Sequence, residues 1–214
     1  MNASLQMQAY EVIKSKIISL ECKPNSIISE ATLLQELDMS RTPIRESLIK
    51  LEQEHFVEII PKRGILILPL SMADVNMIFD TRLLIEPFCV STYHVFIDKK
   101  AVKRIRDEIN KTSPDDSDAF YRQDDELHKL LATSNPNRFL ITTLMHVYDQ
   151  HNRIRAMSSL QVEKRYMNAR NEHLKILDTF LAGDVEKTAK LLSNHLITSK
   201  NIAIQALMDF HLPI

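Results

Sequence analysis

The chain has 214 residues, of which 44% are hydrophobic and 26% charged, the composition of a globular protein with room for one or two domains. Two glycines are too few for a fold rich in tight hairpins, and two isolated cysteines, Cys22 and Cys89, exclude a disulfide framework. The net charge is −1, and residues 1–70 hold eight Lys/Arg against nine Asp/Glu, so bulk charge alone does not indicate a nucleic-acid partner.

The chain shows neither a basic-then-apolar leader nor an apolar run of membrane-spanning length. We therefore expect a cytoplasmic protein without a membrane partner. Long helices are expected to dominate, so the fold class is predicted to be mainly α.

The first seventy residues alternate helical patterns with short turns. Apolar spacing predicts three helices, over residues 6–20, 29–37 and 40–55. Ile27 and Ile28 form a short extended piece between the first two helices. Residues 57–60 and 65–68 are predicted to form two strands around a basic, glycine-containing turn, which is the pattern of a β-hairpin.

The third helix opens with Ser40-Arg41-Thr42-Pro43. Serine suits the N-cap, and proline is tolerated in the first turn, where its missing N–H would bond nothing. Arg41 and Arg45 are four residues apart and share one face. Two arginines and two hydroxyls on an opening turn suit phosphates and base edges. The alternative is an ordinary amphipathic helix whose charges are solvated.

Three helices followed by a hairpin predict a winged helix-turn-helix with a two-stranded wing. In that fold the third helix enters the major groove, and the hairpin reaches the flanking backbone or minor groove. The fold would bring four basic residues to one face: Arg41, Arg45, Lys62 and Arg63.

Residues 8–70 resemble the winged-helix domain of the GntR family of bacterial transcription regulators. The resemblance is carried by Pro24, Ser29-Glu30, Leu33, residues 40–48 and residues 61–64. It implies that DNA is contacted by the opening of the third helix and by the wing, through Ser40, Arg41, Thr42, Arg45, Lys62, Arg63 and Gly64.

Two positions depart from the GntR pattern. Asp38 stands where the turn usually has glycine, and aspartate tolerates the left-handed conformation, so we expect the turn to be kept. Ala31 stands where many relatives carry an arginine that contacts DNA, so this contact is expected to be missing.

Pro69-Leu70-Ser71 interrupts the pattern and predicts a boundary between domains 1–70 and 71–214. The second domain shows only helical patterns and is expected to be an all-helical bundle. Its predicted helices span residues 72–95, 99–112, 116–134, 137–156, 160–182 and 185–210.

Three of these helices carry polar residues on the stripe that should face inward: Asp124, His128, His173 and His195. Burying each of them unpaired would cost about 1–3 kcal/mol. A shared divalent cation removes all four penalties, and three nitrogens with one oxygen suit Zn²⁺, Ni²⁺ or Mn²⁺. The alternative is that each polar group is satisfied separately. His146 and His151 are further candidates to line a pocket.

Residues 72–210 resemble the FCD domain, the helical effector domain of the FadR-like branch of GntR regulators. The matching residues are Arg82, Glu86, Asp124-x-x-x-His128, Asn137, His173, residues 182–184 and His195. The resemblance implies that Asp124 and the three histidines hold the metal. It also implies a small carboxylate effector on or beside the metal, with Arg82 and Asn137 as candidate contacts.

The sequence thus predicts a homodimeric transcription regulator, a repressor, that binds a palindromic DNA operator and responds to a small organic acid. Two alternatives stay open. The metal could be purely structural, or the helical domain could be a metalloenzyme in which the cation activates water.

Overall fold

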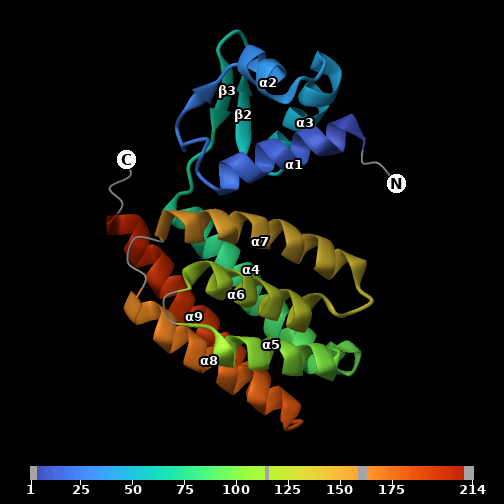
Figure 1. Ribbon diagram of the computed structural model, residues 1–214, viewed down its shortest axis with the longest axis vertical. Coiled ribbons are helices and arrows are strands. Elements are labelled where there is room, and N and C mark those ends of the chain that lie inside the picture. Colours follow the sequence, from blue (N-terminus) through green and yellow to red (C-terminus); the bar gives the residue numbers. More distant parts are fainter. Residues whose placement is uncertain (1–3, 114–115, 159–162, 210–214) are drawn as a thin grey trace. The chain divides into compact units, whose positions relative to one another are not determined.

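The computed structural model describes residues 4–113, 116–158 and 163–209 (Figure 1). The chain divides into two compact units, residues 1–71 and 72–214, here called unit 1 and unit 2. The division falls one residue beyond the expected boundary. Among the described residues, no helix combines the length and the apolar character needed to cross a membrane.

The described residues of unit 1 form the helices α1 (Leu5–Ile18), α2 (Glu30–Leu37) and α3 (Arg41–Gln53). Its strands are β1 (Ile27–Ile28), β2 (Val57–Ile60) and β3 (Gly64–Ile67), which form an antiparallel sheet in the order β1-β3-β2. The predicted hairpin is therefore present, but the sheet has three strands. Ile27 pairs with Leu66 and Ile28 with Ile65. A strand of two residues is too short for a sequence pattern to show which strand it pairs with.

Helix α3 is held in place by its buried apolar face and by the turn that precedes it. Its apolar face, which includes Ile44, Leu48 and Leu51, is buried against α1 and the sheet. Asp38 has φ 49° and ψ 45°, so the turn before α3 is left-handed as expected. Ser40 occupies the N-cap position, but its side chain makes no capping hydrogen bond, which corrects the expected cap.

Unit 2 is a helical bundle: α4 (Met72–Tyr93), α5 (Lys99–Lys111), α6 (Ser117–Thr133), α7 (Arg138–Ser158), α8 (Glu163–Leu181) and α9 (Val185–Asp209). A short 3₁₀ turn, η1 (His94–Phe96), follows α4. The helices agree with the predicted ones to within a few residues. Residues 160–162 and 210, expected at helix ends, lie outside the described residues.

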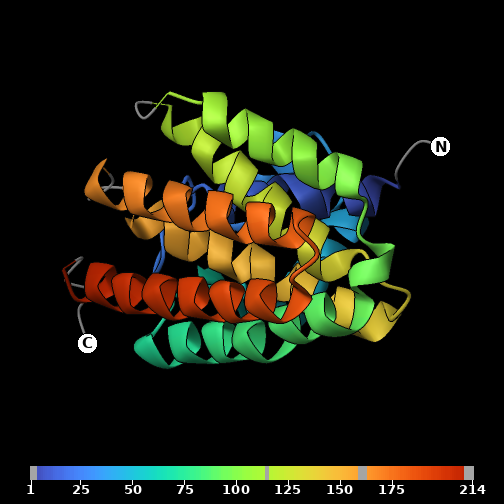
Figure 2. The ribbon, with the colours of Figure 1, turned by 90° about the horizontal axis from the view of Figure 1, so that it is seen from below.

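The packing of unit 2 places α9 between α4 and α8, with α5 beside α8 (Figure 2). Helix α6 contacts α4, α5, α7 and α8, so its inward face lies in the middle of the bundle. An apolar core from α4, α5, α6, α8 and α9 surrounds one end of this face, with Leu127, Leu177 and Leu192 fully buried. The polar residues predicted on inward stripes therefore face one another inside the bundle.

Gly64 provides a test of the three-stranded sheet. It has φ +125°, and a Cβ added there would lie 2.7 Å from the Ile28 carbonyl oxygen on β1. We expect Gly64→Ala to lower the free energy of unfolding by about 1–3 kcal/mol, because strain and a backbone clash add together. Urea denaturation followed by circular dichroism measures the loss.

Gly183→Ala is the matched control for Gly64→Ala. Gly183 also has a positive φ, +86°, but a Cβ there meets nothing within 4 Å. The control isolates the cost of the backbone conformation, so it should destabilise less. Equal losses in the two variants would contradict the pairing of β1 with β3.

Candidate metal centre and nucleic-acid interface

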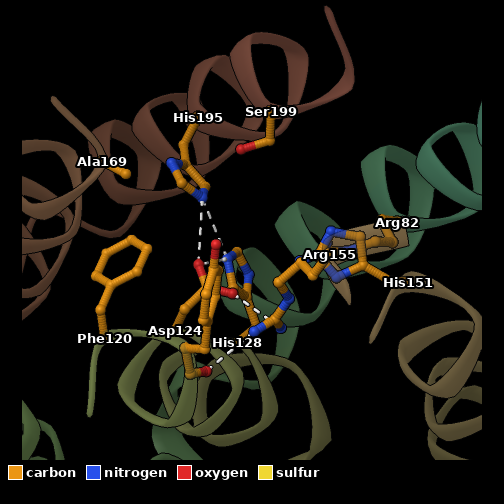
Figure 3. Close-up of a pocket in the computed structure, with 10 residues that line it drawn as sticks. Arg82, Phe120, Asp124, His128, His151, Arg155, Ala169, His195 and Ser199 are labelled. Carbon is orange, nitrogen blue, oxygen red and sulfur yellow. Dashed lines mark hydrogen bonds and ion pairs between the residues drawn. The ribbon is translucent and has the colours of Figure 1, made fainter. Parts of the chain in front are cut away.

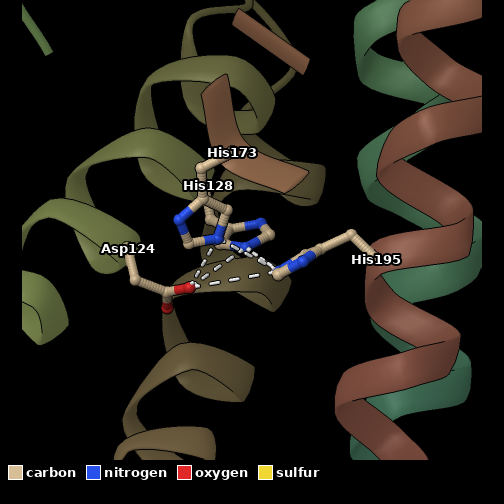
Figure 4. Close-up of side chains that lie close together, drawn as sticks. All are labelled: Asp124, His128, His173 and His195. Carbon is tan, nitrogen blue, oxygen red and sulfur yellow. Dashed lines mark hydrogen bonds and ion pairs between the residues drawn. The ribbon is translucent and has the colours of Figure 1, made fainter. Parts of the chain in front are cut away.

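Asp124, His128, His173 and His195 converge inside unit 2 (Figure 4). Asp124 and His128 lie one turn apart on α6, His173 projects from α8 and His195 from α9. All four are buried, and one potential ligand atom from each lies within 4.8 Å of the others. The four residues singled out from their inward positions in the sequence thus form one cluster.

Nε2 is the nitrogen by which each histidine faces the centre of the cluster. The Nε2 atom of His195 is 3.3 Å from the Nε2 atoms of both His128 and His173. Asp124 Oδ1 lies 3.1 Å from Nε2 of His173, 3.7 Å from that of His128 and 4.0 Å from that of His195. Three imidazole nitrogens and one carboxylate oxygen therefore surround a single point.

Two of the histidines are oriented by carboxylates behind them. His128 Nδ1 is 2.6 Å from Glu86 Oε2, and His195 Nδ1 is 2.8 Å from Glu172 Oε2. A carboxylate accepts the proton of Nδ1–H, which leaves the Nε2 lone pair directed at the cluster. Two such lone pairs 3.3 Å apart repel each other, and a cation between them would turn the repulsion into attraction.

The spacing fits a metal ion with a small adjustment. Two nitrogens bound to one tetrahedral Zn²⁺ at about 2.0–2.1 Å lie about 3.3–3.4 Å apart, as the neighbouring Nε2 atoms do here. Two ligands at that bond length are at most about 4.2 Å apart. The span of 4.8 Å would therefore have to contract slightly around an ion.

Two arginines compensate the acidic groups of the site, Arg82 fully buried and Arg155 partly buried. Arg155 lies 3.0 Å from Asp124 Oδ2, and Arg82 donates to Glu86 Oε1 at 2.5 Å. Burial opposes ionisation of both acids, but the Arg155 guanidinium holds the pKa of Asp124 well below its usual range. Arg82, assisted by His128, likewise lowers the pKa of Glu86 to about 2. Both acids are therefore carboxylates, able to bind a cation or accept Nδ1–H.

Burial also acts on the histidines of this region. It lowers the pKa of His195 to about 4 and that of His151 well below its usual range. Both rings are consequently neutral near pH 7. Neutral imidazole is the form that binds a metal ion, so His195 is in the ligand-competent state.

A cavity of about 20 Å³ adjoins the cluster (Figure 3). It has room for about one water molecule. Among the described residues, Nδ1 of His151 has no hydrogen-bond partner. The lining residues come mainly from α4, α6, α7, α8 and α9: Arg82, Phe120, Tyr121, Asp124, His128, His151, Arg155, Ala169, His195 and Ser199.

The structure separates the two predicted effector contacts. Arg82 lines the cavity, but Asn137 does not. Asn137 Oδ1 instead accepts hydrogen bonds from the backbone N–H groups of Phe139 and Leu140, so this side chain caps α7. The structure thus gives Asn137 a capping role, and its contact with an effector stays a prediction. His146 is also absent from the lining, whereas His151 is part of it.

Glu86, Arg155 and Glu172 belong to the site, although no role was predicted for them from the sequence. Arg155 stands four residues after His151 on α7 and lines the same cavity, so helical spacing from His151 is a signal that could have identified it. Glu172 precedes His173 and is partly exposed, and no pattern distinguishes it from a solvated glutamate.

The residues expected to contact DNA are on the surface of unit 1. Ser40, Arg41, Thr42 and Arg45 are exposed at the start of α3, and Lys62 and Arg63 are exposed at the tip of the β2–β3 hairpin. Arg45 and the hairpin residues 62–64 line a common groove of about 570 Å³. One arginine of α3 is thus brought together with the wing, while Arg41 is not part of this groove.

Comparison with known proteins agrees with both parts of this geometry. Residues 5–67 match the model of the bacterial regulatory proteins of the gntR family, and residues 77–198 match the FCD domain. The chain belongs to the GntR family. It is a DNA-binding transcription regulator with an FCD domain, and the metalloenzyme alternative is set aside because the families and the relatives are regulators.

Relatives of this GntR regulator extend over most of its length. It is 24% identical over 196 residues to the HTH-type transcriptional repressor RspR of Escherichia coli K12, covering 90% of this chain and 86% of the relative. The solved structure of Escherichia coli McbR/YncC has the same fold, with a TM-score of 0.81 at 15% identity over 95% of this chain and 99% of that one.

The FCD domain of TM0439, solved with Zn²⁺ bound, also resembles the C-terminal part of this GntR regulator. The TM-score is 0.58 at 22% identity, over 66% of this chain and 99% of that one. This likeness shows the fold of unit 2.

The Arg82–Glu86 pair yields a stability prediction. Both side chains are almost fully buried. Arg82→Met would leave the Glu86 charge buried without its main partner, so we expect the free energy of unfolding to fall by about 3–5 kcal/mol. Adding Glu86→Gln removes that charge and should recover part of the loss. Urea denaturation in chelator measures Arg82→Met, Glu86→Gln and the double variant. A loss in the double variant equal to the sum of the two single losses would contradict the coupling.

Proposed function

We propose that this GntR-family protein is a repressor whose affinity for its operator is controlled by a small carboxylate bound beside a divalent metal in unit 2. The observation that carries the proposal is the convergence of three Nε2 atoms and Asp124 Oδ1, with carboxylates behind two of the histidines. The name of the RspR relative supports the repressor assignment, and the Zn²⁺-bound FCD domain supports the metal.

Asp124, His128, His173 and His195 would hold the ion. The donor set suits Zn²⁺, Ni²⁺ or Mn²⁺, each of which can accept a further oxygen ligand beyond four protein atoms. A bound ion would supply a positive charge that attracts an anion. Glu86 and Glu172 keep two of the rings in the orientation that binds it.

The cavity beside the cluster suits a carboxylate. Arg82 and Arg155 give it two guanidinium groups, and the Nδ1 atom of His151 offers a hydrogen-bonding position with no partner among the described residues. Guanidinium groups recognise carboxylates through strong charge-assisted bonds. Both arginines already bind acids of the site, Glu86 and Asp124, so an incoming carboxylate would compete for them.

The size of the cavity indicates how binding could change the protein. A space of about 20 Å³ holds one water molecule, which is smaller than any organic acid beyond its carboxyl group. An acid can therefore enter only if the groups that line the cavity move apart. A ligand that binds the shifted arrangement preferentially displaces the equilibrium toward it, which is the requirement for allosteric control.

Unit 2 also carries a surface suited to a second copy of the chain. On α4 the exposed apolar side chains Met77, Leu84 and Phe88 follow helical spacing, and Leu84 is 76% exposed. Phe139 is 71% exposed on α7, which packs against α4. An exposed apolar stripe of this kind is characteristic of an interaction surface. A homodimer would present two α3 helices to a palindromic operator in the cytoplasm.

On the operator, the opening of α3 would enter the major groove and the hairpin would contact the neighbouring backbone. Ser40, Arg41, Thr42 and Arg45 are the contacts proposed on α3, and residues 62–64 those on the hairpin. Their exposure and the groove shared by Arg45 and the hairpin support this assignment.

Metal binding is tested with His195→Ala. The wild type should bind one Zn²⁺ per chain, and free Zn²⁺ at 100 times its Kd should raise the free energy of unfolding by about 2.7 kcal/mol. The variant should lose both the ion and the stabilisation, because one of four ligands is gone. Elemental analysis and denaturation measure these. The control is His94→Ala, because His94 lies outside the cluster. If His195→Ala still binds one Zn²⁺ per chain, the metal site lies elsewhere.

Effector control is tested on DNA. The Zn²⁺-loaded wild type is used to select duplexes from a randomised library, and a dimer should select an inverted repeat. Small mono- and dicarboxylates are then added, and one class should weaken binding by about 5- to 150-fold. His151→Phe should keep Zn²⁺ and DNA affinity but lose the response. If no acid alters the wild type, the metal is structural and the effector assignment is wrong.

A further inference from the structure

Arg45, the proposed base-reading residue of α3, is held by an acidic side chain of α2. Its Nε donates to Glu30 Oε1 at 3.0 Å and to Oε2 at 3.1 Å, and its Nη2 donates to Oε2 at 3.1 Å. Arg45 is 61% exposed at its side chain and Glu30 is 29% exposed. A carboxylate thus stands on the surface that faces DNA, where a negative charge repels phosphates.

Glu30 is itself well fixed. It is the first residue of α2, and Ser29 caps that helix by accepting a hydrogen bond from the Thr32 N–H at 3.0 Å. A carboxylate at a helix N-terminus is stabilised by the helix dipole. Leu33 on α2 is buried in the core of unit 1 together with Leu48 on α3, so the position of α2 relative to α3 is fixed by this packing.

The hydrogen bonds select one edge of the guanidinium group. A guanidinium can make paired bonds through its side edge, Nε and Nη2, or through its end, Nη1 and Nη2. Glu30 occupies the side edge. The end remains available, and a pair of parallel N–H groups matches O6 and N7 of guanine in the major groove.

Arg41 offers the contrast on the same helix. It is exposed, and within the described residues no hydrogen bond or ion pair holds its side chain. An arginine without a fixed orientation can follow the nearest phosphate, whereas Arg45 has its orientation set before DNA arrives. Preorganisation of this kind lowers the entropic cost of a specific contact.

We propose that Glu30 is a specificity-determining positioning residue, which directs the end of the Arg45 guanidinium to a guanine and keeps it from the phosphate backbone. The proposal rests on the assignment of α3 as the DNA-reading helix. Glu30 acts through Arg45 and need not contact DNA.

The test compares selected sequences. Wild type, Glu30→Gln and Glu46→Gln are each used to select duplexes from the same randomised library, and the base preferences are read by sequencing. Glu46 is exposed on α3, so its variant removes an equal charge from the same domain. With Glu30→Gln, preference for guanine at one position of each half-site should fall about fivefold or more, while random-sequence DNA binds more tightly. With Glu46→Gln the guanine preference should be unchanged.

A double-mutant cycle distinguishes positioning from a general effect. Arg45→Ala should remove the guanine preference, and adding Glu30→Gln to Arg45→Ala should change the selected sequence no further. Thermal melts show whether each variant is folded. An unchanged guanine preference in folded Glu30→Gln, or a further change in the double variant, would overturn the proposal. Failure of the wild type to select any sequence would instead contradict the DNA-reading assignment of α3.

Discussion

The helical unit depends on the convergence of one carboxylate and three imidazoles at its centre. Asp124, His128, His173 and His195 occupy positions that would otherwise be filled by apolar side chains, and they come from α6, α8 and α9. Such a cluster is costly to bury unless every polar atom has a partner. The surrounding acids and arginines provide partners for most of these polar atoms. A cation would provide the partner for the four atoms that face the centre of the cluster.

The same device recurs in both units. Glu86 and Glu172 each fix a histidine through the nitrogen turned away from the cluster, and Glu30 fixes Arg45 through the edge turned away from the proposed DNA contact. In each case a carboxylate accepts hydrogen bonds from one side of a histidine or arginine side chain and leaves the opposite side free to bind a ligand. The acids differ in burial, since Glu86 is enclosed whereas Glu30 remains partly in solvent. Removing one partner of the Arg82–Glu86 pair should therefore cost more stability than removing one partner of the Arg45–Glu30 pair.

The spacing of apolar residues predicted most of this fold, because a helix that buries one face repeats apolar residues every three to four positions. The same stripes identified Asp124 and the three histidines, since a polar residue in an apolar row is unusual. What periodicity could not give was a partner across helices. The pairing of β1 with β3 involves only two residues of β1, and in the sequence Glu172 is indistinguishable from a solvent-exposed glutamate. Asn137 was expected to contact the effector, and in the structure it caps α7. The first two depend on where a second chain segment lies in space, whereas the Asn137 cap is a local contact with the start of its own helix.

Helices α4 and α7 connect the cavity with the proposed dimer surface. On α4, Arg82 and Glu86 face the cluster while Leu84 and Phe88 face outward. On α7, His151 faces the cavity and Phe139 the exterior. Because packed helices move as rigid elements, a carboxylate that displaced Arg82 from Glu86 would shift the outer faces of the same helices. The proposed dimer surface would then depend on what occupies a cavity with room for about one water molecule.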